Sequence, residues 1–151
     1  MTQHDYLIVG AALVDILAST ESLEKVDISH KYVEHLMCLS LSSKTSLKEL
    51  KLHPGGSALN VAVTLDCMGA RSAFLTGIGD GVFGEYILRR LRDTNINISY
   101  VKKCKTKSGI SINLISGGEK SSLVYHGAVD ELGASDITPA MVKNAKHILM
   151  T

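Results

Sequence analysis

The chain has 151 residues, of which 45% are hydrophobic and 21% charged, as expected for one globular domain with a packed apolar core. Its formal net charge of +1 argues against a dedicated nucleic-acid surface, because such surfaces carry a strong basic excess. The sequence has neither an apolar run near the roughly 18 residues of a membrane span nor a secretory signal. We therefore expect a cytoplasmic protein that binds neither membranes nor nucleic acid.

The cysteines and histidines form no metal-binding pattern in the sequence. The three cysteines, Cys38, Cys67 and Cys104, are odd in number and far apart, so we expect reduced thiols rather than a disulfide framework. None of the six histidines has a zinc-ligand spacing supported by a neighbouring Cys or carboxylate. We therefore predict no structural metal.

The first predicted element is the apolar run Tyr6–Val9, which stops at Gly10. A short continuous apolar run is typical of a strand buried on both faces of a parallel sheet. Asp15 follows just beyond the C-terminal end of this strand, and that edge of an open α/β sheet is where ligands bind. Taken alone, Asp15 is equally compatible with a turn residue or a helix cap.

Residues 19–53 are rich in Ser, Glu and Lys, and their hydrophobic periodicity is weak. Short strands, a helix around Lys31–Leu36 and a polar loop at Ser40–Ser46 are all compatible with this stretch.

The segment Pro54–Ala62 is the most informative in the chain. Two adjacent glycines, Gly55 and Gly56, end an extended stretch, and a polar turn then opens a helix. Bare backbone beside a helix N-terminus allows the hydroxyl groups of a ligand to approach closely. The helix is almost wholly apolar as far as Gly69, so it is expected to pack against a sheet and to end there.

A second strand and a second helix follow. Ser72–Thr76 predicts another core strand, and Asp80 is placed to cap the next helix. The positions expected to face inward on that helix are Val82, Phe83, Ile87, Leu88 and Leu91. The alternation of strand and helix predicts a parallel three-layer α/β sandwich, to which Asn95–Val101 would add a third strand.

The last third of the chain changes character. Ile110–Leu114 alternates apolar and polar residues, and Ser116–Glu119 and Ser122–Tyr125 complete an antiparallel hairpin with one solvated face. Thr138–Pro139 opens a short helix with a cap and an N1 proline. His147–Met150 predicts one more buried strand, and we expect that the domain is cut there.

In this order, the motifs resemble the ribokinase-like, or pfkB, family of sugar and nucleoside kinases. Gly55–Ala62, followed by Gly69 and Gly79, is similar to the family's N-terminal glycine signature. Val9–Asp15 resembles its first strand with the substrate aspartate, and Gly79–Gly84 resembles its Gly-Asp-x-x-Phe-Gly turn.

The resemblance implies a fold and its parts. The fold is α/β, a three-layer Rossmann-like parallel sheet with a small β lid. Residues 1–151 would form the N-terminal, substrate-binding part of a single ribokinase-like domain, with lid elements within 19–53 and 108–126. The chain would be truncated before the C-terminal nucleotide-binding half.

The resemblance also implies an activity, in which ATP with Mg²⁺ phosphorylates a hydroxyl of a sugar or nucleoside. Asp15 would accept hydrogen bonds from two substrate hydroxyls, Asn60 would bond another, and Gly55 and Gly56 would place backbone amides against the substrate. Asn60 alone could equally be a helix cap, and Asp80 is better explained as a cap than as a catalytic group. The sequence leaves open sugar versus nucleoside, and a homodimer through the lid is a further implication.

The family's catalytic base, an aspartate in a Gly-Ala-Gly-Asp-like motif, has no counterpart in this sequence, and neither has a P-loop. We therefore expect no catalytic residue in this chain and no activity from it alone. One alternative is a non-catalytic binding or regulatory protein with the same fold. A dinucleotide-binding oxidoreductase is disfavoured, because Gly10 is followed by Ala11, Ala12 and Leu13 instead of the glycine fingerprint.

Overall fold

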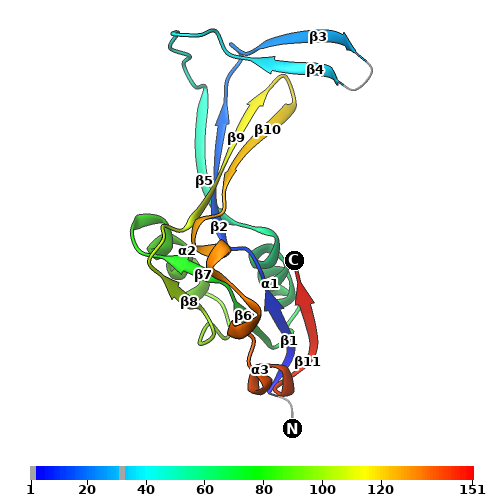
Figure 1. The fold of residues 1–151 in the computed structure, drawn as a ribbon, viewed down its shortest axis with the longest axis vertical. Helices are drawn as coiled ribbons and strands as arrows, with labels where there is room; N and C mark the ends of the chain where they lie inside the picture. The colour runs from blue at the N-terminus through cyan, green and yellow to red at the C-terminus, as the bar shows by residue number, and fades with distance from the viewer. Residues whose placement is uncertain (1–2, 31–32) are drawn as a thin grey trace.

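The computed structural model describes residues 3–30 and 33–151 and has two parts, a body and a projecting lid (Figure 1). The body is built on a parallel sheet with the strand order β11-β1-β6, and the lid is a sheet with the order β10-β9-β2-β5. The body strands are β1 (His4–Val9), β6 (Ser72–Leu75) and β11 (Ala145–Met150). The lid strands are β2 (Leu13–Ser19), β5 (Glu49–Gly55), β9 (Gly109–Ser116) and β10 (Glu119–Tyr125).

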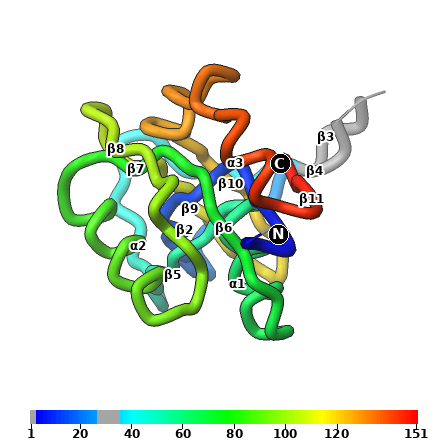
Figure 2. Tube along the Cα trace, turned by 90° about the horizontal axis from the view of Figure 1, so that it is seen from below, coloured from blue at the N-terminus to red at the C-terminus, as the bar shows by residue number. Residues whose placement is uncertain are grey.

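The body is a three-layer sandwich, as predicted. Seen from below, α1 and α2 lie on one side of the sheet, and the segment containing α3 lies on the other (Figure 2). Ile8 of β1 packs in the cluster that contains α1 and α2, whereas Leu7 packs in the cluster that contains Met141 of α3. Alternate residues of one strand thus serve opposite faces of the sheet. The helices are α1 (Ser57–Cys67), α2 (Val82–Arg92) and α3 (Pro139–Lys143), with 3₁₀ turns η1 (Gly127–Glu131) and η2 (Ala134–Asp136) before α3.

Strand β1 confirms the predicted buried parallel strand. It pairs in parallel with β11 on one side and β6 on the other, and Leu7 and Ile8 are fully buried. Strand β11 is present where His147–Met150 predicted a strand, but the prediction that it is buried is wrong. It is the outer strand of the sheet, and His147, Ile148 and Met150 are exposed.

Helix α2 corrects two details of the sequence prediction. Its N-cap is Gly81, with no side-chain cap, so Asp80 lies one residue too early to cap the helix. Val82, expected inside, is largely exposed at the first helical position, whereas Ile87, Leu88 and Leu91 are buried as predicted. No helix among the described residues is both long and apolar enough to cross a bilayer.

The stretch 19–53 contains strands and no helix among its described residues. β3 (Glu24–His30) and β4 (Val33–Cys38) form an antiparallel hairpin that lies across the far end of the lid (Figure 1). The predicted helix around Lys31–Leu36 is wrong for Val33–Leu36, which belongs to β4, while residues 31–32 lie outside the described residues. Ser40–Ser46 is a loop, as predicted.

The third strand expected at Asn95–Val101 is wrong. This segment makes one isolated bridge, between Ala73 and Asn97, because Asn97 Oδ1 accepts a hydrogen bond from the Ser99 amide at 2.9 Å and turns the chain locally. A short strand comes later, where β8 (Lys102–Cys104) pairs with β7 (Gly77–Gly79).

Candidate functional site

Asp15 lies where the lid joins the body. It is the third residue of β2, a strand that begins with the buried residues Leu13 and Val14 and continues into the lid. Asp15 is therefore held in a strand and does not lie in the loop after β1. It is half-buried, and its cross-strand neighbours are His53 of β5 and Ser111 of β9. Residues in register share one face of a sheet, so these side chains stand on the same face of the lid.

Gly55 lies directly against the Asp15 carboxylate. A Cβ atom at position 55 would lie 2.0 Å from Asp15 Oδ2, far inside van der Waals contact. Any side chain at position 55 would therefore displace either the carboxylate or the backbone of β5. The structure brings together these two predicted site residues from adjacent strands.

Gly56 begins helix α1 beside the connector from β1 to β2. It is the N-cap, with φ 103° and no side-chain cap, and a Cβ there would lie 2.5 Å from the carbonyl oxygen of Ala11. The Leu59 amide donates to that same carbonyl at 3.2 Å. The amino end of a helix carries a partial positive charge. Glycine backbone and the partly positive amino end of α1 therefore lie beside the Asp15 carboxylate.

Asn60 lies one turn into α1 and is exposed. Its backbone amide donates to the Gly56 carbonyl, and its backbone carbonyl accepts from the Thr64 side-chain hydroxyl. The Asn60 side chain is not a helix cap, because the N-cap is Gly56 and has no side-chain cap. Among the described residues, no hydrogen bond joins the Asn60 side chain to Asp15 or to the two glycines.

The structure adds three polar side chains that the sequence did not single out. Asn113 Nδ2 donates to Asp15 Oδ1 at 3.3 Å and to Ser111 Oγ at 3.1 Å, and Ser122 Oγ donates to Asn113 Oδ1 at 2.7 Å. Asn113 is only 4% exposed and Ser111 7%. The alternation in β9 predicted that these residues lie on a solvated face, and here the prediction is wrong. The missing information was that β2 is a strand and pairs with β9.

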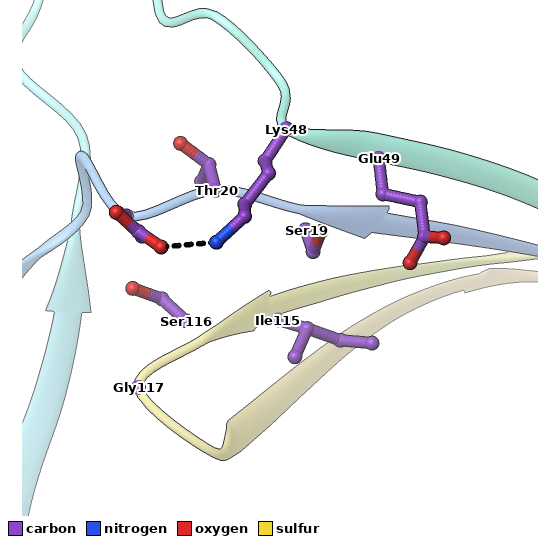
Figure 3. Close-up of a pocket in the computed structure, with 8 residues that line it drawn as sticks. Ser19, Thr20, Lys48, Glu49, Ile115, Ser116 and Gly117 are labelled. Atoms are coloured by element: carbon purple, nitrogen blue, oxygen red, sulfur yellow. Dashed lines mark hydrogen bonds and ion pairs between the residues drawn. The ribbon is translucent and has the colours of Figure 1, made fainter.

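Two cavities lie apart from these residues. One, of about 440 Å³, is at the far end of the lid, where Lys48 Nζ pairs with Glu21 Oε1 at 2.5 Å near Thr20 and Ser116 (Figure 3). The other, of about 700 Å³, lies between the start of α2 and the lid and is lined by, among others, Phe83. Neither cavity is lined by Asp15, Gly55, Gly56 or Asn60.

The described residues around Asp15 provide no three-residue set of metal ligands. Across residues 3–30 and 33–151, no three His, Cys, Asp or Glu side chains come together in a group that could hold a metal ion. The polar groups beside Asp15 are amides and hydroxyls of Asn113, Ser111 and Ser122, which suit a neutral polar ligand better than a divalent cation.

Comparisons with known proteins agree on one protein family. A family model described as pfkB family carbohydrate kinase matches residues 11–151. A sugar kinase of Pyrococcus horikoshii, itself uncharacterized, is 32% identical over 120 residues, covering 76% of this chain and 39% of that protein. The ribokinase of Bacillus subtilis is 33% identical over 93 residues, covering 61% of this chain and 30% of that protein. The chain thus spans about two fifths or less of the length of these relatives.

Solved structures share the fold. The structure of Arabidopsis thaliana ribokinase, complexed with ribose and ATP, matches with a TM-score of 0.76 at 19% identity, covering 99% of this chain and 45% of that one. The P. horikoshii protein in complex with ATP matches with a TM-score of 0.73 at 24% identity, covering 96% of this chain and 42% of that one. At these identities the likeness shows the fold alone, a ribokinase-like α/β sandwich with a β lid.

Proposed function

This chain belongs to the pfkB family of carbohydrate kinases, and we propose that it forms the acceptor-binding half of a sugar kinase that uses ATP. The observation that carries the proposal is the contact between Asp15 and Gly55, beside the uncapped N-terminus of α1. A carboxylate offers about four lone-pair sites and can accept hydrogen bonds from two hydroxyls. The adjacent backbone amides can donate to the oxygens of the same hydroxyls.

The roles that we propose follow from this chemistry. Asp15 binds two neighbouring sugar hydroxyls, Gly55 and Gly56 let the sugar approach the backbone, and Asn60 bonds a further hydroxyl from α1. A site of this kind selects against analogues that lack a hydroxyl, because its polar groups would then be buried without partners.

The nucleotide half of the reaction lies, in this proposal, outside these residues. Phosphoryl transfer needs a residue that orients or deprotonates the attacking hydroxyl and cationic groups that stabilise the transferred phosphoryl. The sequence has no Gly-Ala-Gly-Asp-like motif to supply such a base, and no three His, Cys, Asp or Glu side chains among the described residues come together as a metal site. We therefore expect these 151 residues alone to bind a sugar without transferring phosphate to it.

A binding screen tests the proposal. The thermal unfolding temperature of the chain would be followed with ribose, fructose, ketodeoxygluconate and adenosine, and each hit would be confirmed by isothermal titration calorimetry. A ligand at 100 times its dissociation constant stabilises the folded state by ~2.7 kcal/mol, so a true acceptor gives a clear shift.

Two variants serve as the controls for this screen. Asp15→Ala should abolish the shift, whereas Asp93→Ala, an exposed carboxylate at the end of α2, should leave it intact. The proposal is wrong if no sugar binds or if both variants bind as the wild type does. ATP binding by these residues would contradict the placement of the nucleotide outside them.

A homodimer through the lid is the partner that we propose. Strand alternation places Leu50, Leu52, Leu123 and Tyr125 on the lid face opposite Asp15, and all four are exposed. Together they form an apolar patch of the kind that marks protein contacts.

Leu123→Lys should give a monomer by light scattering coupled to size exclusion. Val124→Lys, on the other face of the same strand, should remain dimeric, and a monomeric wild type would disprove the dimer.

A further inference from the structure

We propose that Asn113 is a positioning residue that orients the Asp15 carboxylate toward the sugar. The inference rests on the proposed acceptor site and adds to it a relay of side chains across the lid. In the strand order β10-β9-β2-β5, each strand contributes one residue in turn: Ser122, Asn113, Asp15 and Gly55. Ser122 donates to Asn113, Asn113 donates to Asp15, and Gly55 lies against the far side of the carboxylate.

The hydrogen bonds of Asn113 allow only one orientation of its amide. A carboxylate only accepts hydrogen bonds, so the nitrogen of Asn113, and not its oxygen, must face Asp15 Oδ1. The oxygen then faces Ser122, whose hydroxyl donates to it at 2.7 Å. The remaining amide proton is directed to Ser111, whose hydroxyl oxygen lies 3.1 Å and whose carbonyl oxygen lies 3.2 Å from Nδ2.

Burial makes this arrangement stiff. Asn113 is 4% exposed, although its partner Ser122 is exposed, and a buried amide without partners costs ~1–3 kcal/mol. Ser122 lies directly opposite Asn113 in the antiparallel pair β9–β10, so the backbone ladder fixes the distance between them. The amide is therefore held from the β10 side before any ligand arrives.

The two oxygens of Asp15 consequently have different surroundings. Oδ1 is bonded to Asn113, while Oδ2 faces the bare backbone of Gly55. Held from both sides, the carboxylate cannot rotate freely, and its remaining lone pairs keep one direction. A group that is ordered before binding loses less entropy when the ligand binds, so the relay should contribute to affinity without touching the sugar.

A purely structural role for Asn113 makes a different prediction. If the residue only pinned the β9–β10 hairpin, its removal would lower the stability of the protein and leave the sugar affinity of the folded fraction unchanged. The positioning role requires the affinity itself to fall. The chain offers a matched pair for this comparison, because Ser121 and Ser122 are neighbours in β10 and point to opposite faces of the lid.

The first measurement needs no ligand. In the sugar-free chain, the carboxyl ¹³C resonance of Asp15 should shift in Asn113→Leu, which removes the amide but keeps its approximate size, and shift less in Ser122→Ala. It should not move in Ser121→Ala. An Asp15 resonance that is unchanged in Asn113→Leu would overturn the relay, whether or not any sugar binds.

The second measurement uses the sugars that bind the wild-type chain by calorimetry. We expect Asn113→Leu to weaken binding about tenfold and Ser122→Ala about threefold, or ~1.4 and ~0.7 kcal/mol, while Ser121→Ala binds as the wild type does. Urea unfolding of each variant gives the folded fraction used in the analysis. If wild type and Asn113→Leu bind equally, the inference fails and the proposed function stands. If no sugar binds the wild type, the proposed function fails, and the acceptor role of Asn113 fails with it.

Discussion

The body and the lid bury their side chains to very different extents. All four residues of β6 are buried in the body, whereas all seven residues of β10 are exposed in the lid. The same residue type shows the contrast: Leu7 of β1 is 0% exposed and Leu123 of β10 is 64% exposed. Apolar burial is the main source of folding free energy, so the body supplies most of the stability and the lid depends on it.

The difference explains where a binding site can form. A fully apolar core has no room for the polar groups that bind a sugar, and an exposed sheet alone cannot desolvate them. Between the two, β2 passes from the buried Val14 to the half-buried Asp15. There a carboxylate can be partly shielded from water and still reach a ligand.

The largest difference in the free energy of unfolding should appear when a leucine is truncated in each of the two regions. Leu7→Ala leaves a cavity in the body and should lower the free energy of unfolding by ~2–5 kcal/mol. Leu123→Ala in the lid, measured at a concentration at which the chain is monomeric, should change it by no more than ~0.5 kcal/mol. Urea denaturation of both variants measures the difference, and similar losses would show that the lid has a core of its own.

A second experiment acts where the two regions meet. Gly55→Ala places a methyl group 2.0 Å from Asp15 Oδ2, so it should weaken sugar binding at least about tenfold, or ~1.4 kcal/mol. Gly133→Ala is the matched control, since its nearest neighbour would be a serine hydroxyl at 3.8 Å. Calorimetric titration compares the two, and unchanged affinity in Gly55→Ala would mean that Asp15 does not contact the sugar.

A smaller effect is expected at the helix cap of the body. Thr138 Oγ1 accepts a hydrogen bond from the Met141 amide at 3.3 Å at the start of α3, and Thr138→Ala should cost ~0.5–1 kcal/mol. Ser43→Ala, in the exposed loop beyond the lid, removes a bond to Ser40 at 2.7 Å and should cost less. Equal losses in thermal unfolding would contradict the view that stability resides in the body.

The smallest effect should appear as a pH dependence that belongs to the body alone. Hydrogen bonds from Arg71, and then from Lys146, hold the pKa of Asp5 well below its ordinary value. The ionised Asp5 carboxylate therefore stabilises the folded state fully above the ordinary carboxyl pKa of about 4. This contribution is lost as the pH falls below that value.

Urea unfolding between pH 6 and pH 3 tests this prediction. The free energy of unfolding should fall less steeply in Asp5→Asn than in the wild type, and added salt should reduce the difference because the pair is near the surface. The same pH slope in both proteins would show that Asp5 contributes nothing. Asp93→Asn provides a control carboxylate at the end of α2.

The body was largely predictable because its signals are local. The continuous apolar run Tyr6–Val9 and the segment Ser72–Thr76 correspond to β1 and β6, and Thr138 caps α3 as expected. The exceptions are also local in origin. Asn95–Val101 has strand-like composition, yet the Asn97 side chain accepts a hydrogen bond from the Ser99 amide. The N-cap of α2 is Gly81 instead of Asp80.

The lid was harder to predict because its order depends on distant pairing. β2 and β5 are separated in sequence by the β3–β4 hairpin, and the polar residues between them carry no clear period-2 pattern. Without β2 as a strand, nothing in the sequence places Asn113 beside Asp15. The predicted residues Asp15, Gly55 and Gly56 do lie together, but their binding role stays a prediction, as does that of Asn60.

The pairing of β2 also constrains how this fold can vary in length. Asp15 and Ile16 point to opposite faces of the lid, and only the connector Gly10–Ala12 separates β2 from β1. Deleting one residue there would bring Ile16 to the position of Asp15, and inserting one would bring Val14 there. In either case Asp15 would turn to the opposite face of the lid. The tip at Gly117–Gly118 has no such restriction. We therefore expect a change of length at the tip of the lid to disturb the site less than a change of length in the three-residue connector.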